Sequence, residues 1–302
     1  MCNLFEVSRS GYYDWSKRPP SKRCKKDIEI LEAIKESHVK SRKIYGIRKI
    51  HADIKEQFGC GINRVHRLMR AHGIHSIRPR KYKATTNPKH NLPVADNLLQ
   101  QDFEALNPNE VWVSDISYIA TGEGWLYLAA VKDLFNKEVV GTAMGSSMTK
   151  ELVIKAMQQA VQRHRPKAGL IHHSDRGSQY ASHDFQNLLK KNGFIPSMSN
   201  KGNCYDNAPA ESLFGTIKSE LVYLNRYETR DEARQAVFEY VEVFYNRLRR
   251  HASLGYLTPA EFKKRYFQEK QFKAEGSQGP AKLGEDLPLT AHNSLPCWLP
   301  DM

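Results

Sequence analysis

The middle of the chain carries short apolar segments with the two-residue periodicity of β-strands. Between residues 111 and 120, Val111, Val113 and Ile119 share one parity, while aromatic and aliphatic residues occupy the other. This pattern predicts a strand with apolar contacts on both faces. Two further apolar segments, 125–131 and 139–144, follow after short polar connections. Three consecutive strands with short connections predict an antiparallel meander.

Helical and strand patterns then alternate. The segments predict a helix at 149–163, a strand at 169–173, a helix at 184–191, a strand at 194–198 and a helix that contains Glu211. The predicted order is three strands, helix, strand, helix, strand and helix. This order predicts an α/β fold with a mixed sheet flanked by helices.

The first 90 residues show helical periodicities instead. Apolar residues from Ile28 to Ile34 predict one helix with Asp27 as its cap, and residues 47–58 predict a second. Asn63 is suited to cap a third. Residues 4–8 have the pattern of the end of a helix whose beginning is missing, and a turn with an aromatic cluster is expected after them.

The glycine-rich turn between the second and third of these helices suggests how the region functions. Arg64, Arg67 and Arg70 are expected to project away from the apolar face of the third helix. Two short helices joined by such a turn, the second rich in arginine, are typical of a DNA-binding helix-turn-helix. An ordinary helical hairpin with solvated charges is the alternative.

Charge distribution favours the DNA-binding interpretation. The net charge of +13 resides in residues 1–90, which hold 22 Lys and Arg against 8 Asp and Glu, whereas the remainder holds 24 against 25. A basic segment beside a nearly neutral one is the electrostatic signature of a nucleic-acid binder joined to another domain. We therefore expect a basic helical DNA-binding region and linker at 1–90 and a catalytic core at 105–225.

The C-terminal part begins with Thr229 and Glu232, which have the spacing of a capping box, ahead of a strongly amphipathic helix. This helix ends in a basic cluster at 247–251, for which DNA contact and a solvated helix end are equal alternatives. We expect a helical extension at 226–267 and a disordered tail at 268–302, where glycine and proline interrupt every pattern.

Several features narrow the class of protein. No apolar segment is long enough to span a bilayer, and no signal-peptide core is present at the N-terminus, so a cytoplasmic protein without membrane association is expected. The five cysteines are scattered and form no CxxC pair, which argues against a zinc site.

Three acidic residues lie where the predicted core could bring them together. Asp115 lies in the first strand, Asp175 follows the fourth, and Glu211 lies in the helix after the last strand, with 59 and then 35 residues between them. Each alone is more often an exposed structural residue. Together they could hold two Mg²⁺ ions, which prefer oxygen ligands and serve phosphoryl transfer; Mn²⁺ can substitute.

These residues and their neighbours resemble a known family. Trp112-Val113-Ser114-Asp115, His173-Ser174-Asp175-Arg176-Gly177 and Glu211-Ser212-Leu213-Phe214 resemble the catalytic core of bacterial insertion-sequence transposases related to retroviral integrases. The 35-residue spacing is typical of that family, and Tyr45-Gly46-Ile47-Arg48 and the segment 249–255 also resemble its members.

The resemblance implies an RNase H-like fold and a Mg²⁺-dependent polynucleotidyl transferase that cuts and joins DNA. It implies that Asp115, Asp175 and Glu211 are both catalytic and metal-binding, and that Lys218 holds the DNA end. The DNA partners would be transposon ends and target. A homo-oligomer is expected on DNA, because paired ends must be brought together. The resemblance also implies the downstream product of a two-frame element, joined by frameshifting to an upstream DNA-binding segment.

Two alternatives remain open on the sequence. An RNase H-like nuclease that cuts without joining would have the same acidic residues. A non-catalytic DNA-binding regulator of transposition would use only the basic region. Within the core, His172 and His173 are not expected to bind metal, since Mg²⁺ disfavours imidazole. Asp206 or Asn207 is expected to cap the Glu211 helix.

Overall fold

The computed structural model describes residues 2, 5–77, 94–200 and 203–276, in two units that divide after Lys264. The helices are α1 (Arg9–Lys17), α2 (Lys22–Lys40), α3 (Ile47–Phe58), α4 (Ile62–Ala71), α5 (Lys150–His164), α6 (His183–Lys191), α7 (Ala208–Glu220), α8 (Arg230–Glu239) and α9 (Pro259–Gly276). The strands are β1 (Val111–Thr121), β2 (Gly124–Asp133), β3 (Val139–Gly145), β4 (Ile171–Ser174) and β5 (Ile195–Met198). Among the described helices, none is both long enough and apolar enough to cross a membrane.

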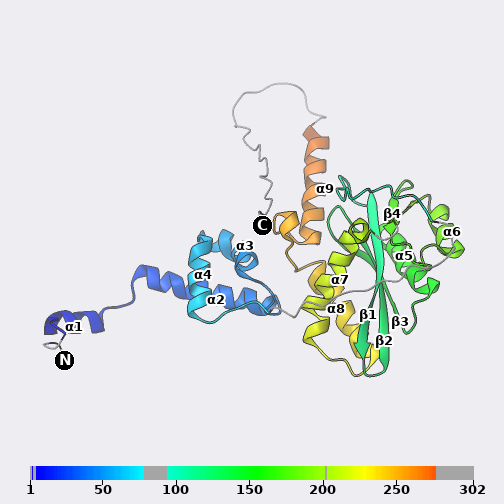
Figure 1. The fold of residues 1–302 in the computed structure, drawn as a ribbon. Coiled ribbons are helices and arrows are strands. Elements are labelled where there is room, and N and C mark those ends of the chain that lie inside the picture. Colours follow the sequence, from blue (N-terminus) through cyan, green and yellow to red (C-terminus); the bar gives the residue numbers. More distant parts are fainter. Residues whose placement is uncertain (1, 3–4, 78–93, 201–202, 277–302) are drawn as a thin grey trace, which may run out of the picture. The chain divides into compact units, whose positions relative to one another are not determined.

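The sheet has the order β3-β2-β1-β4-β5 (Figure 1). β1, β2 and β3 pair in antiparallel fashion, whereas β4 pairs in parallel with both β1 and β5. The predicted meander and mixed sheet are therefore confirmed. The parallel half follows from the connections, because α5 and α6 supply the crossovers that parallel strands require.

Each face of the sheet is covered by helices. Beneath α5 and α6 lies a core that includes Trp112, Val131 and Met157. On the opposite face, α7 and α8 pack against β1 and β2, where Ile119 and Leu126 are buried. The close approach of α5 to β3 depends on Gly141, since a Cβ there would lie 2.3 Å from the Ala156 carbonyl oxygen.

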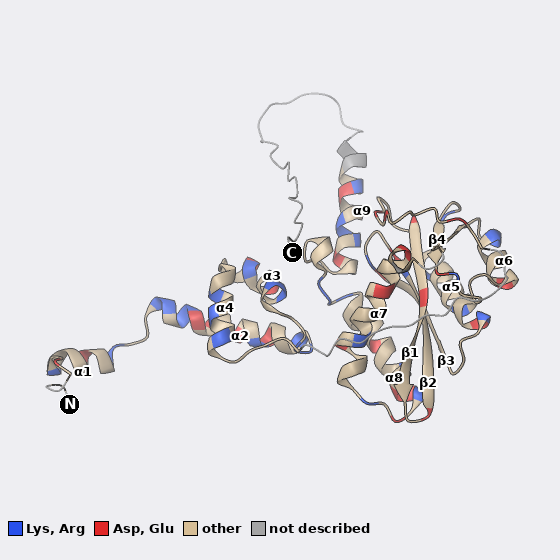
Figure 2. Ribbon diagram, viewed as in Figure 1, with Lys and Arg blue, Asp and Glu red and all other residues tan. Residues whose placement is uncertain are grey.

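The N-terminal region contains α1 to α4, and four sequence predictions about it are wrong. Residues 5–8 form a turn and extended backbone, where the end of a helix was expected. Arg9–Lys17 forms α1, capped by the Ser8 hydroxyl, where a turn was expected. The cap of α2 is Ser21, whereas Asp27 lies within the helix. α4 begins after Gly61, and the Asn63 side chain makes no cap hydrogen bond. Lys and Arg recur along these helices (Figure 2).

The predicted amphipathic helix after Thr229 is present, with its capping box. It runs as α8 and then widens into a π-helical turn at Tyr240–Tyr245. Asn246 follows this turn. Its side-chain amide accepts from the Val139 N–H at 2.9 Å and donates to the Val139 carbonyl at 3.0 Å, so it pairs with the first residue of β3 as a neighbouring strand would. The expected tail from residue 268 is helical as far as Gly276, and residues 277–302 lie outside the described residues.

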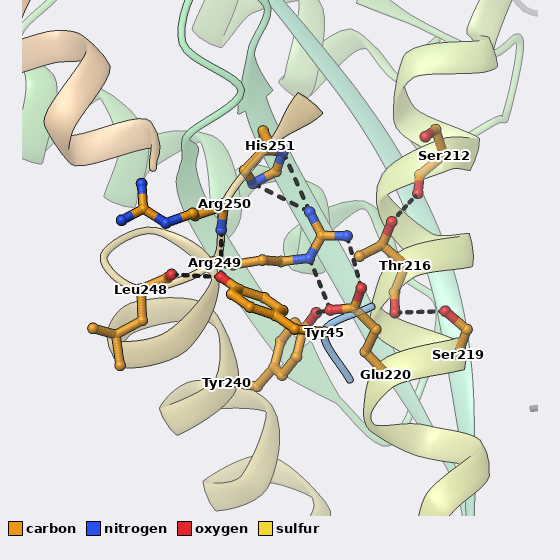
Figure 3. A network of polar contacts seen from close by, with 10 residues as sticks. All are labelled: Tyr45, Ser212, Thr216, Ser219, Glu220, Tyr240, Leu248, Arg249, Arg250 and His251. Carbon is orange, nitrogen blue, oxygen red and sulfur yellow. Dashed lines mark hydrogen bonds and ion pairs between the residues drawn. The ribbon is translucent and has the colours of Figure 1, made fainter. Parts of the chain in front are cut away.

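A buried polar network surrounds the segment after this turn (Figure 3). The Arg249 guanidinium donates to both carboxylate oxygens of Glu220, the last residue of α7, at 2.8 and 2.7 Å, and the Tyr240 hydroxyl donates to the same carboxylate. Burial alone would raise the pKa of Glu220, but the hydrogen bonds and charge of Arg249, together with the Tyr240 hydrogen bond and the charge of Lys49, lower it overall. Within the basic cluster, Arg249 is therefore neither solvated at the helix end nor available to contact DNA.

The same network reaches the N-terminal region. The Tyr45 hydroxyl donates to the Leu248 carbonyl at 2.8 Å and accepts from the Arg250 N–H at 2.7 Å. The Arg250 side chain pairs with Asp53 of α3. Sequence segments some 200 residues apart thus share hydrogen bonds.

Removing one partner of the Arg249–Glu220 pair should destabilise the protein strongly. Both side chains are about one-tenth exposed, so Arg249→Met leaves an uncompensated buried carboxylate. We expect a loss of about 3–5 kcal/mol in the free energy of unfolding, measured by urea titration. The double variant Arg249→Met, Glu220→Leu should recover most of it.

The matched control is Arg234→Met, which breaks the exposed Arg234–Asp231 pair on α8. Its cost should stay below about 1 kcal/mol. Equal losses in Arg249→Met and Arg234→Met would contradict the description of a buried pair.

The Arg249–Glu220 pair also predicts a pH dependence. The pKa of Glu220 lies below its ordinary value of 4.5 in the folded protein. Its contribution to stability is therefore complete above the unfolded pKa of 4.5 and is lost as the pH falls through the folded value. Below pH 4.5, wild type should therefore lose stability relative to the double variant, which lacks this carboxylate. A constant difference between pH 7 and pH 3 would show that Glu220 is not held as a carboxylate.

Candidate active site

The pairing of β1 with β4 brings two of the three predicted acidic residues together. The parallel register pairs Val113 with His173 and Ser114 with Ser174. The next residues in the two strands are Asp115 and Asp175. Because neighbouring strands lie about 4.8 Å apart and run in the same direction, these carboxylates leave the paired stretch side by side.

The charges around Asp115 reflect this placement. Burial, together with the charges of Asp175 and Glu211, raises the pKa of Asp115 to about 8, although the Ile116 N–H and Lys218 oppose the shift. Asp115 thus lies within electrostatic reach of both other predicted acids. A carboxyl group held among like charges favours either a proton or a cation.

Asp175 is oriented by the turn that follows β4. Its Oδ1 accepts from the Gly177 N–H at 2.9 Å. A Cβ at residue 177 would lie 2.9 Å from that same oxygen, which explains why glycine occupies this position of the Asp-Arg-Gly sequence. Arg176 turns away and donates to the Ser199 carbonyl at 2.6 Å.

Glu211 lies in the first turn of α7 and is exposed. The start of this helix is fastened by the buried Lys132 amino group, which donates to the Pro209 carbonyl at 3.1 Å. Burial lowers the pKa of Lys132 to about 7. Partial burial also raises the pKa of Glu211.

Asp206 has a structural role that the sequence prediction missed. Its carboxylate accepts from the side chains of Asn97, Gln101 and Asn203 and from the Asn200 N–H, at 2.8–3.0 Å. It therefore holds the loop before α7 to the segment before β1. The predicted helix cap is wrong for Asp206, and Asn207 occupies the N-cap position without a side-chain cap bond. The signal in the sequence was an acidic residue five positions before Glu211, in the loop that leads into α7.

Three other polar residues near the site have structural roles, and the two histidines agree with the expectation that they do not bind metal. His172 and His173 are both buried; His172 shares a hydrogen bond with the Ser114 hydroxyl at 2.8 Å, and His173 with the Ser197 hydroxyl at 2.9 Å. Burial lowers the pKa of His172 to about 3. Asp133 is also buried and accepts from the Phe135 N–H in the turn after β2 and from the Asn109 N–H just before β1.

The described residues contain no preformed cluster of three His, Cys, Asp or Glu side chains that could hold a metal ion. This arrangement agrees with the electrostatics, because carboxylates repel one another unless a cation lies between them. The donor set itself fits a hard cation: it consists of carboxylate oxygens, with Asp115 already coupled to Asp175 and Glu211.

Lys218 lies on α7, two helical turns beyond Glu211. Its amino group lies 4.8 Å from the ring centroid of Tyr118 in β1. Burial lowers the pKa of Lys218, while the charge of Asp115 opposes that shift. The structure therefore brings Lys218 into the electrostatic environment of Asp115.

The predicted DNA-binding arginines differ in their surroundings. Asp27 of α2 accepts from both Arg64 and Arg67 at 2.7 Å, and these hydrogen bonds lower the pKa of Asp27. Arg64 and Arg67 also line a hollow of about 390 Å³ together with Arg23. Arg70 is exposed.

Comparison with known proteins identifies the regions. A family model described as an integrase core domain matches residues 105–204, a second of that description matches residues 211–267, and an HTH-like domain matches residues 25–82. The predicted helix-turn-helix and integrase-like core are thereby confirmed.

Two relatives match nearly their whole length. An uncharacterized 31 kDa protein of insertion element IS600 from Shigella sonnei is 49% identical over 89% of this chain and 99% of its own. The transposase InsF for insertion sequence IS3A from Escherichia coli strain K12 is 38% identical over 87% of this chain and 92% of its own. The chain belongs to the family of insertion-sequence transposases that includes InsF of IS3, with an HTH-like domain ahead of an integrase core.

Proposed function

We propose that the chain is a Mg²⁺-dependent DNA transposase in which Asp115, Asp175 and Glu211 form the catalytic site. The observation that carries this proposal is the Ser114–Ser174 pairing, after which two carboxylates emerge side by side from parallel strands. Glu211 supplies the third charge from α7. The family membership provides the activity; the residue roles and the ions are our assignment.

Asp115, Asp175 and Glu211 would hold two Mg²⁺ ions, for which Mn²⁺ can substitute. Bound there, such ions would activate the attacking oxygen and neutralise charge on the reacting phosphate. The protein's own contribution is positional. Asp175 is held by its turn, and α7 is fixed at one end by Lys132 and at the other by the Arg249–Glu220 pair.

DNA binding is assigned to Lys218 and to the second helix of the HTH-like domain. Lys218 is placed to hold the reacting end, since it lies near Asp115. Arg64, Arg67 and Arg70 belong to α4, and Asp27 orders the first two rather than leaving them as free surface charges. We expect phosphate contacts at the hollow lined by Arg23, Arg64 and Arg67.

Two features of the assembly follow from the same proposal. Synapsis of paired ends requires a homo-oligomer on DNA, and light scattering of the complex with end DNA would show its mass. An upstream-frame DNA-binding protein, fused or separate, is proposed as a further partner, and assays with and without it would test this. A monomer on end DNA would remove the first expectation.

Asp115→Asn should abolish chemistry without unfolding the protein. We expect at least a 10²–10³-fold loss of nicking and joining, measured with the element's own terminal DNA in Mg²⁺ or Mn²⁺. Each form should be tested with and without the upstream reading frame fused. Asp184→Asn is the matched control, because Asp184 is an exposed acid of the same core, paired with Lys150.

The products distinguish the alternatives. Joined strands lost in Asp115→Asn support a transposase. Nicks without joining, in fused and unfused forms alike, would indicate a nuclease. DNA binding without chemistry in every wild-type form would indicate a regulator and overturn the catalytic assignment.

Divalent ions should stabilise the wild-type protein through the same carboxylates. At an ion concentration 100 times the dissociation constant, binding contributes about 2.7 kcal/mol, which corresponds to a rise in Tm of about 5–10 °C. Asp115→Asn should lose this rise, although without metal it should be at least as stable as wild type because repulsion is relieved. Asp184→Asn should keep it. An undiminished rise in Asp115→Asn would place the ion elsewhere.

A further inference from the structure

A cavity of about 510 Å³ lies next to the proposed catalytic site. It opens at the far end of the β1–β2 hairpin, where the segment after α7 faces the strands. Its walls include Tyr118, Trp125, Lys218, Tyr223, Arg226 and Tyr227. We call it the hairpin cavity. Its volume lies within the range of about 300–1,000 Å³ that is usual for ligand sites.

Tyr227 belongs to the core, but two other aromatic side chains of this cavity are largely exposed. Trp125 is 50% exposed and Tyr223 is 41% exposed, although both are large rings. Trp125 meets Tyr118 edge to face, with ring centroids 4.8 Å apart and planes at 78°. Tyr118 is thereby fixed, whereas much of the Trp125 ring still faces solvent. Exposed aromatic surface of this kind marks a binding site.

Strand pairing explains why the cavity opens here. β4 pairs with β1 only through Ser114, whereas β2 continues to pair as far as Thr121. From Asp115 onward, β1 therefore has a strand neighbour on one side alone among the described residues. The Tyr118 ring at this edge is reached by the Lys218 amino group from α7.

The charge of the cavity suits a nucleic acid. Lys218 and Arg226 contribute two positive charges and Glu228 one negative charge. Aromatic rings combined with cations are the features that bind single-stranded nucleic acid, because every base has a face that can stack and every linkage carries a negative phosphate. Lys218 is shared between this cavity and the environment of Asp115.

We propose that the hairpin cavity receives one unpaired base of the DNA, from a nucleotide next to the phosphate that reacts at Asp115. The proposal rests on the catalytic site proposed above. The base would stack on Trp125 and Tyr223, while Lys218 holds the adjoining phosphate. Extrusion of a base would keep the terminal strand separated from its complement at the point of cutting.

The test is a thermodynamic cycle between the protein and the DNA. Duplexes of the element's terminal sequence would carry a single abasic nucleotide at each position near the cleaved phosphate. Their affinities would be measured by fluorescence anisotropy in Ca²⁺ for wild type and Trp125→Ala. With intact DNA, Trp125→Ala should bind about 5- to 100-fold more weakly. At one abasic position, this difference between the two proteins should vanish.

Two further variants make the result specific. Phe238→Ala removes an equally exposed aromatic ring from α8, outside the cavity, and should bind every duplex as wild type does. Trp125→Phe keeps a ring that can stack on a base, so it should retain part of the affinity for intact DNA. If Trp125→Ala lost affinity only because it misfolded, its remaining weakness would not depend on the abasic position. Equal affinities of wild type and both Trp125 variants for intact DNA would overturn the proposal.

The outcome can be separated from that of the proposed function. Metal-dependent nicking by wild type is measured on the same duplexes. If wild type nicks, but no abasic position removes the effect of Trp125→Ala, the cavity proposal fails and the catalytic one stands. If the cycle shows coupling at one position and no form nicks or joins, the base-binding site stands and the catalytic assignment fails.

Discussion

The pairing of β4 with β1 is the constraint on which the rest of the structure depends. It aligns Asp115 with Asp175 at the point where the paired stretch ends, and so places like charges together. Such crowding is unfavourable without a cation, and it adds to the effect of burial in raising the pKa of Asp115. Hydrogen bonds hold the neighbouring residues in place despite this repulsion. Ser114 is tied to His172, and the Asp175 turn is closed by Gly177.

Glu211 lies on a helix rather than in the sheet, so its position depends on the contacts that hold that helix. α7 is held at its start through Lys132 and the Asp206 loop, and at its end through Glu220 and Arg249. Between these ends lie Glu211 and Lys218. A helix fixed at both ends is well suited to carry groups whose distance from Asp115 matters.

Local sequence patterns predicted much of this fold. The parity of residues 111–120 placed the strand, and the spacing of Thr229 and Glu232 gave a capping box that the structure confirms. Helix starts were less predictable, because the sequence offers several polar residues of similar capping ability near each start. Asp27 was mistaken for a cap; its actual partners, Arg64 and Arg67, lie in another helix. The three acidic residues were predicted from residue type, spacing and a resemblance, and the β1–β4 register places Asp115 beside Asp175. The hairpin cavity depends on where β4 stops pairing, which no local pattern encodes.

The basic cluster after the π-helical turn shows why some roles require the folded chain. In the sequence, Arg249 and Arg250 are two adjacent cations at a helix end, for which solvent or DNA would serve equally. In the structure, Arg249 pairs with Glu220, whereas Arg250 pairs with Asp53 and, at 3.8 Å, with Glu261. Buried ion pairs add little net stability over an apolar contact, since desolvation offsets attraction. Their consequence is selectivity, because an alternative packing would leave a buried charge without its partner. Arg249 and Arg250 therefore specify which helices meet, and through Glu220 that specification extends to the helix that carries Glu211.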